Sequence, residues 1–182
     1  KCLIQSVKLI KANKPIVSKV YIPKFILILV KIGVNGFKMF ISLLIIVAML
    51  AVWRVPITYN VIYIIPILMT LIVLVFGFSC YLLHYGVFVE DLSNVLNIAL
   101  RFLFYLTGIF WSIMDRLPAP YNSYIGRCNP IAFLLTSARD CVIYGSTPHR
   151  KLLLLWFVIG LIISALGVRK IYKNENSYVK VI

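Results

Sequence analysis

The chain has 182 residues, of which 62% are hydrophobic and only 13% are charged. Soluble domains carry roughly 45–50% apolar and about 25% charged residues, so the composition indicates an integral membrane protein. The net charge of +14 would suit a nucleic-acid-binding protein, but the basic residues form no RNA- or DNA-reading module. They gather beside apolar segments, as expected of cytoplasmic loops.

The amino-terminal stretch reads KCLIQSVKLIK, without an initiator Met or a signal peptide, so we expect the chain to be part of a longer protein. Between Lys14 and Lys24, apolar residues alternate with lysines, and Pro23 interrupts the pattern before the first long apolar segment. Such an element lies on anionic lipid, docks a partner, or only fixes the topology. We assign residues 1–24 to a cytoplasmic interfacial segment.

Four segments are long and apolar enough to cross a bilayer, which takes about 20 apolar residues. The first is centred on Met39–Trp53 and extends back towards Ile26, and the second, Val61–Leu83, carries no charge. The third, Leu92–Met114, has one charge, and the fourth, Leu152–Val168, is short but uncharged. The sequence thus predicts an all-α integral membrane protein with four transmembrane helices.

The segment between the third and fourth spans, residues 115–151, never becomes plainly water-soluble. Asn129 is a favoured N-cap, Pro130 suits the first helical position and Gly145 is a natural terminator, so these residues predict a helix of about four turns. Prolines upstream break the preceding span and permit a second short helix around Tyr121–Arg127. Two short re-entrant helices at the outer face would line a passage, because non-helical backbone at membrane depth must face protein or water. A plain surface loop is the alternative.

Twelve of the 19 lysines and arginines fall in the segments that an inside start makes cytoplasmic, against six in the outer segments. Cytoplasmic loops carry the excess of positive charge. Both ends of the chain, including the tail over residues 169–182, are therefore predicted to be cytoplasmic. Residues 1–182 then form a single transmembrane domain.

The motifs of common catalytic and metal sites do not occur. There is no GxxxxGK[ST] phosphate loop and no HExxH pair, and His84 and His149 lie on opposite sides of the predicted membrane. The four cysteines form no CxxC pair, and Cys128 and Cys141 either pair in an oxidising compartment or stay free. We predict neither catalysis nor a metal or cofactor bound by this chain.

Four stretches resemble, in order and at fitting intervals, one family of membrane subunits. They are IVSKVYIPKFILIL, FVEDLSNVLNIALRFLFYLTGIFW, RCNPIAFLLTSARDCVIYG and a final span with a short basic tail. The chain resembles the permease subunit of ABC exporters for lipid-linked polysaccharides, the family of teichoic acid and O-antigen translocation permeases. One departure is Glu90, which stands where the family usually has Arg. The family-motif residues, to which structural roles are assigned, are Asp91, Asn129, Pro130, Arg139 and Gly145.

The resemblance implies a six-span subunit of which this chain is the carboxy-terminal four-span part, without the family's interfacial helix and first two spans. It also implies a homodimer in the bacterial plasma (inner) membrane, among membrane lipids, that passes teichoic acid or the O-antigen of lipopolysaccharide along the dimer interface for cell envelope biogenesis. Two ABC ATPase subunits would bind ATP and Mg²⁺ and supply the energy. On this interpretation the chain is a transport subunit and not an enzyme.

A sliding polymer needs aromatic faces for stacking and hydrogen bonds that hold it only weakly. Each aromatic ring is equally well explained as an anchor at the membrane interface. The one charge within the third span, Arg101, either faces a cavity where it meets phosphates of the substrate, pairs with Asp91, or reaches back to the interface. The residues assigned to the substrate path are Arg101, Phe102, Tyr105, Phe110, Trp111, Tyr121 and Tyr124.

The resemblance also places the contact with the ATPase in the basic segment before the first span, where closure of the ATPase pair would tilt that span. The residues assigned to it are Lys14, Val17, Lys19, Val20, Tyr21, Pro23 and Lys24. Three other functions stay open: an ABC permease for drugs or small lipids, a membrane-embedded enzyme, and a structural membrane protein without a transport role.

Overall fold

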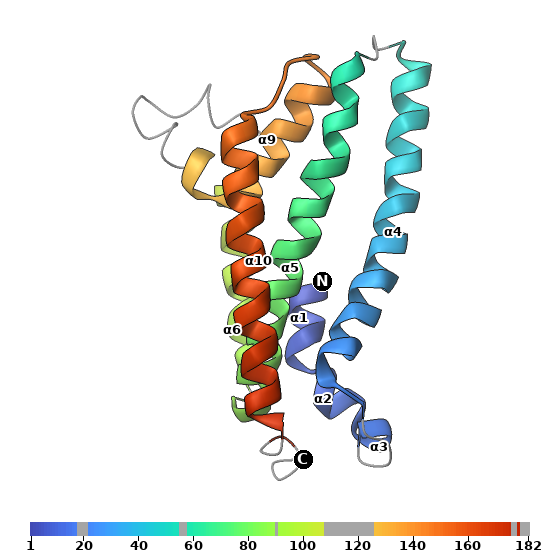
Figure 1. Cartoon of the computed structure of the whole chain (residues 1–182). Helices are drawn as coiled ribbons and strands as arrows, with labels where there is room; N and C mark the ends of the chain where they lie inside the picture. Colours follow the sequence, from blue (N-terminus) through green and yellow to red (C-terminus); the bar gives the residue numbers. More distant parts are fainter. Residues whose placement is uncertain (18–21, 55–57, 90, 108–125, 176–177, 179–182) are drawn as a thin grey trace. The chain divides into compact units, whose positions relative to one another are not determined.

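The computed structural model describes residues 1–17, 22–54, 58–89, 91–107, 126–175 and 178, and no strand occurs among them. Three short helices come first, followed by the long α4, a 3-10 helix (η1) that leads into α5, and then α6, α9 and α10 (Figure 1). Their bounds are α1 Cys2–Val7, α2 Leu9–Ala12, α3 Lys14–Val17, α4 Lys24–Val52, η1 Tyr59–Tyr63, α5 Ile64–Phe88, α6 Leu92–Leu106, α9 Pro130–Val142 and α10 Arg150–Lys173.

Three of these helices are long and apolar enough to cross a membrane: α4, the continuous stretch Tyr59–Phe88, and α10. They contain the first, second and fourth predicted spans, which confirms the prediction of an all-α membrane protein. The third predicted span, Leu92–Met114, begins as the 15-residue α6. The rest of that span and most of the predicted short helix around Tyr121–Arg127 lie outside the described residues, so the third predicted crossing stays a prediction.

The chain divides into two compact units. Unit 1 consists of Lys1–Arg54, Ile72–Asn97 and Gly160–Ile182, and therefore holds α1 to α4 with the later part of α5 and of α10. Unit 2 consists of Val55–Leu71 and Ile98–Ile159, and holds η1, α9 and the first turns of α5 and α10.

In unit 1, α5 and α10 approach closely through small residues. A Cβ atom added to Gly77 would lie 2.9 Å from a side-chain carbon of α10, and one added to Gly167 would lie 2.7 Å from Cys80 Cβ. The Ser164 hydroxyl donates a hydrogen bond to the Val73 carbonyl at 3.0 Å. Small residues and interhelical hydrogen bonds are how helices associate in a membrane, where lipid tails are as apolar as leucine.

The amino-terminal helices of unit 1 pack against the long ones. The α1 backbone lies so close to Gly86 of α5 that a side chain there would collide with the Val7 carbonyl. The Asn35 amide of α4 donates to Gln5 Oε1 of α1 at 2.9 Å. The buried core that joins these helices to α10 and the tail consists of Leu9, Ile10, Ile28, Cys80, Leu83, Val87, Ile171 and Tyr178.

Candidate functional site

The predicted start of α9 in unit 2 is confirmed. Asn129 is the N-cap, and its side-chain oxygen accepts hydrogen bonds from the backbone N–H groups of Ile131 at 3.1 Å and Ala132 at 3.4 Å. Pro130 occupies the first helical position, where the N–H that it lacks would have no partner in the helix. The local sequence therefore fixes the residue at which α9 begins.

Replacing the cap tests this account. We expect Asn129→Ala to destabilise α9 by about 1 kcal/mol, because two backbone N–H groups lose their acceptor. Hydrogen exchange of the backbone amides in Pro130–Val142 should become faster, while Asn129→Asp, which keeps an acceptor, should exchange like the natural chain. Unchanged exchange in Asn129→Ala would show that packing alone sets this end of the helix.

Gly145 closes the other end of α9 and joins it to η1. Its φ of +61° is left-handed, a conformation that glycine adopts without steric cost. The Ser146 N–H donates to the Asp140 carbonyl at 3.0 Å across the turn. The Gly145 carbonyl accepts from the Asn60 amide, and an added Cβ would lie 2.8 Å from Thr58 Oγ1. The predicted terminator thus also anchors the loop before α10 to the loop before α5.

A small cavity of about 100 Å³, with several charged and hydroxyl-bearing residues in its lining, lies beside α9 within unit 2. Burial raises the pKa of the Asp140 carboxyl, an effect that the adjacent Arg139 guanidinium partly opposes. Charged groups, hydroxyls and one buried ring line the cavity, which suits a ligand rich in hydroxyls or phosphate. The lining residues are Gly126, Arg127, Phe133, Thr136, Ser137, Asp140, Thr147, Pro148, His149 and Leu152.

The two cysteines near this cavity are free thiols. Cys128 is exposed just before α9, whereas Cys141 is buried on the face that α9 turns inward. Burial, and secondly the neighbouring Asp140 charge, raise the pKa of the Cys141 thiol. The sequence left open whether Cys128 and Cys141 form a disulfide, and in the structure they do not.

Only part of the predicted substrate path lies among the described residues. Arg101, Phe102 and Tyr105 all belong to α6 and have exposed side chains. The Tyr105 ring meets the neighbouring Phe104 ring edge to face, with centroids 5.8 Å apart. The other four assigned residues, which lie outside the described residues, are Phe110, Trp111, Tyr121 and Tyr124. The path stays a prediction.

The predicted ATPase contact is described only at its ends. Lys14 begins α3 and Val17 ends it, while Pro23 is the residue before α4. The residues between them, Lys19, Val20 and Tyr21, lie outside the described part of the chain. Lys24, the first residue of α4, is buried rather than available on a surface.

Lys24 is held by the carboxy-terminal tail. Its Nζ lies 2.7 Å from Glu175 Oε1, and the two side chains are only 4% and 11% exposed. Nearby in unit 1, the Tyr178 hydroxyl lies 2.8 Å from His84 Nδ1. Burial, followed by the charges of Glu175 and Cys80, raises the pKa of Tyr178 to about 12. We call the four residues Lys24, His84, Glu175 and Tyr178 the tail clamp.

Of the remaining family-motif residues, Asp91 lies immediately before α6. Its carbonyl accepts the Asn94 N–H at 2.9 Å, and its carboxylate lies 3.5 Å from the Asn94 amide. Glu90, the departure from the family pattern, lies outside the described residues. Among the residues that are described, no three His, Cys, Asp or Glu side chains gather closely enough to hold a metal ion.

Two curated proteins match the chain over nearly its whole length. Both are described as O-antigen export system permease protein RfbA from Klebsiella pneumoniae, and each is 23% identical over 172 residues, or 94% of this chain. The chain is thus similar to two O-antigen export permeases. It spans 65% of the length of these two relatives. No family model and no solved structure matches it. The resemblance predicted from the four stretches is thus confirmed.

The sequence did not reveal the tail clamp or the anchoring of Gly145. Glu175 and Tyr178 sit in the polar stretch NENSYVK, which has no apolar period and looks like a solvated tail. The sequence offered one signal for the clamp, which is that acidic residues are scarce. With only five Asp and Glu in a chain of net charge +14, each acidic side chain has many lysines and arginines with which it could pair.

Proposed function

We propose that the chain is the carboxy-terminal part of the permease subunit of an ABC exporter for lipid-linked polysaccharide. It acts as a homodimer in the bacterial inner membrane, and a separate ATPase subunit binds ATP and Mg²⁺. The observation that supports this most strongly is the match to two O-antigen export permeases over 94% of the chain. The three membrane-crossing helices agree with it.

Some of the described residues could bind a polymer weakly enough to let it slide. The cavity beside α9 holds about 100 Å³, enough for one polar group but not for a sugar chain. Its Arg127, Asp140 and hydroxyl groups would bind one unit briefly, through hydrogen bonds that are individually modest. The exposed Phe102 and Tyr105 rings of α6 offer faces on which sugar rings stack.

Depletion of the full-length protein in its host tests the function. We expect lipid-linked polymer to accumulate on the cytoplasmic side while surface polysaccharide falls, and expression of the natural gene should reverse both changes. Normal surface polymer in depleted cells would overturn the proposal. If only drug sensitivity or phospholipid distribution changed, the chain would be a permease for small molecules instead.

A single arginine tests the substrate path. Arg101→Ala should reduce export at least tenfold if the guanidinium meets phosphates of the substrate, because a charge-assisted bond of about 1.5–3 kcal/mol is lost. Surface polymer would be measured at equal amounts of assembled permease. Arg101→Lys keeps the charge and should retain part of the activity, and Arg54→Ala, which removes an exposed arginine after α4, is the matched control. Full export by Arg101→Ala would remove Arg101 from the path.

The assigned ATPase contact is tested by crosslinking. A cysteine at Val17 or Val20, in a chain without its natural cysteines, should form a crosslink with the ATPase subunit in membranes. A cysteine at Phe40, which is exposed in the middle of α4, should not. Equal capture from both places would contradict the assignment.

A further inference from the structure

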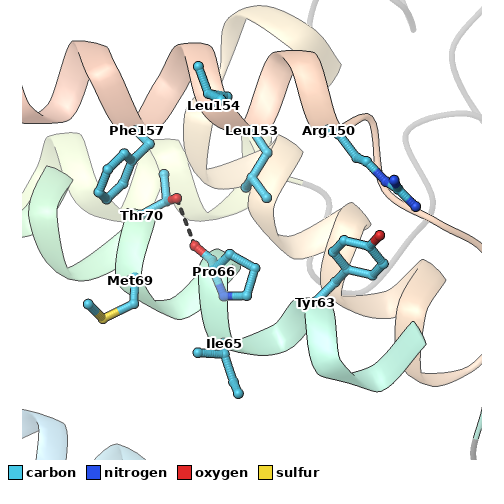
Figure 2. Close-up of a pocket in the computed structure, with 9 residues that line it drawn as sticks. All are labelled: Tyr63, Ile65, Pro66, Met69, Thr70, Arg150, Leu153, Leu154 and Phe157. Carbon is cyan, nitrogen blue, oxygen red and sulfur yellow. Dashed lines mark hydrogen bonds between the residues drawn. The ribbon is translucent and has the colours of Figure 1, made fainter. Parts of the chain in front are cut away.

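A groove of about 470 Å³ runs along the first turns of α5 and α10 in unit 2 (Figure 2). Its volume falls within the roughly 300–1,000 Å³ of ligand-binding pockets. All its residues belong to described helices of one compact unit. The residues that line it are Tyr63, Ile65, Pro66, Met69, Thr70, Arg150, Leu153, Leu154 and Phe157.

The body of the groove is apolar. Ile65 is 64% exposed, Met69 is 53% exposed and Leu154 is 65% exposed. These large apolar side chains are therefore free to contact a ligand in the groove. Thr70 carries a polar atom here, but its hydroxyl already donates to the Pro66 carbonyl at 2.8 Å (Figure 2). The body therefore presents almost nothing to a polar ligand and fits a hydrocarbon chain.

One end of the groove is cationic. The Arg150 guanidinium carbon lies 5.1 Å from the centre of the Tyr63 ring, a cation–π contact that holds the arginine at this end (Figure 2). His149 and Lys151, on either side of Arg150, line a polar recess together with it. A guanidinium in this position offers paired N–H donors to the oxygens of a phosphate.

We propose that this groove binds an anionic phospholipid of the surrounding bilayer. One acyl chain lies along Met69, Leu154 and Phe157, and the lipid phosphate meets Arg150. The complementarity is of both shape and charge: an apolar channel ends in a fixed cation at the first residue of a membrane-crossing helix, where headgroups lie. This lipid site is separate from polysaccharide export and does not depend on it.

Photo-crosslinking tests the site. The full-length protein in neutral detergent micelles would be exposed to phosphatidylglycerol with a diazirine in its acyl chain, or to phosphatidylcholine with the same chain. Phosphatidylglycerol should label peptides that contain Ile65–Thr70 and Leu153–Phe157 about fivefold more than phosphatidylcholine, the preference expected of one basic residue at an anionic headgroup. Equal labelling by the two lipids would overturn the proposal.

Three variants sharpen the test. Arg150→Ala should abolish the preference for phosphatidylglycerol, whereas Arg54→Ala, the matched control, removes an exposed arginine that does not line the groove and should keep it. Met69→Trp should block labelling by filling the groove, and it keeps the test decisive if Arg150→Ala does not fold. Equal losses in Arg150→Ala and Arg54→Ala would mean unspecific attraction and contradict the site. Crosslinks from these helices to a second copy of the chain in place of lipid would do the same.

Discussion

Glu175→Ala is expected to lower the free energy of unfolding by about 3–5 kcal/mol. The substitution leaves Lys24, whose side chain is only 4% exposed, without the carboxylate that lies 2.7 Å from its ammonium nitrogen. Removing one partner of a buried ion pair has a cost in this range, because the remaining charge stays desolvated. Denaturant unfolding of the purified protein measures the change. Lys173→Ala, an exposed lysine in the last turn of α10, should change stability by less than about 0.5 kcal/mol.

The double variant Lys24→Met, Glu175→Leu separates loss of the pair from loss of packing. Apolar side chains of similar volume can replace a buried ion pair at little net cost, since neither charge then has to be desolvated. We expect this double variant to recover most of the stability that Glu175→Ala loses. If Glu175→Ala were no less stable than Lys173→Ala, the ion pair between Lys24 and Glu175 would contribute nothing to folding.

Gly167→Leu should be the most damaging single change in the contact between α5 and α10. A Cβ at this position would already lie 2.7 Å from Cys80 Cβ and 3.3 Å from the Gly77 carbonyl oxygen, and a longer side chain would force the helices apart. Overpacking of this kind costs about 1–3 kcal/mol and occasionally more. Thermal unfolding in detergent would report the loss as a lower midpoint.

The matched control is Gly36→Leu in α4, where an added Cβ meets nothing within 4 Å. Both variants place the same side chain inside a long apolar helix, and the two positions differ in whether an added side chain meets neighbouring atoms. Gly36→Leu should be neutral or slightly stabilising, because leucine has the higher helix propensity. Equal midpoints in the two variants would show that α5 and α10 do not need their close approach.

Local rules in the sequence predicted the three long helices and both ends of α9. The three long apolar segments gave α4, α5 and α10 because a membrane-crossing helix is defined by composition over about 20 residues. The start of α9 was predictable because Asn129 and Pro130 act on neighbouring backbone groups, and its end because Gly145 adopts a conformation that other residues resist. α4 begins at Lys24, directly after the Pro23 that interrupts the preceding pattern, and Glu175 is the partner of this buried first residue.

Contacts between distant residues could not be predicted in the same way. Glu175 lies 151 residues after Lys24, and Asn60 lies 85 residues before Gly145, so no periodic pattern links either pair. The glycines of α5 and α10 looked like ordinary small residues of apolar segments, because a close approach depends on which helix is the neighbour. The groove along α5 and α10 has the same origin, since its lining comes from two segments that lie far apart in the sequence, as Tyr63 and Arg150 do.

The glycine contacts between α5 and α10 also limit how this protein can move. Where Gly77 and Gly167 bring backbone against neighbouring atoms with no spare space, one helix cannot slide or turn along the other without steric collision. These portions of the two helices therefore move as one rigid body. Any larger rearrangement of the protein then has to take place in other segments of the chain, while the contact between these two helices stays unchanged.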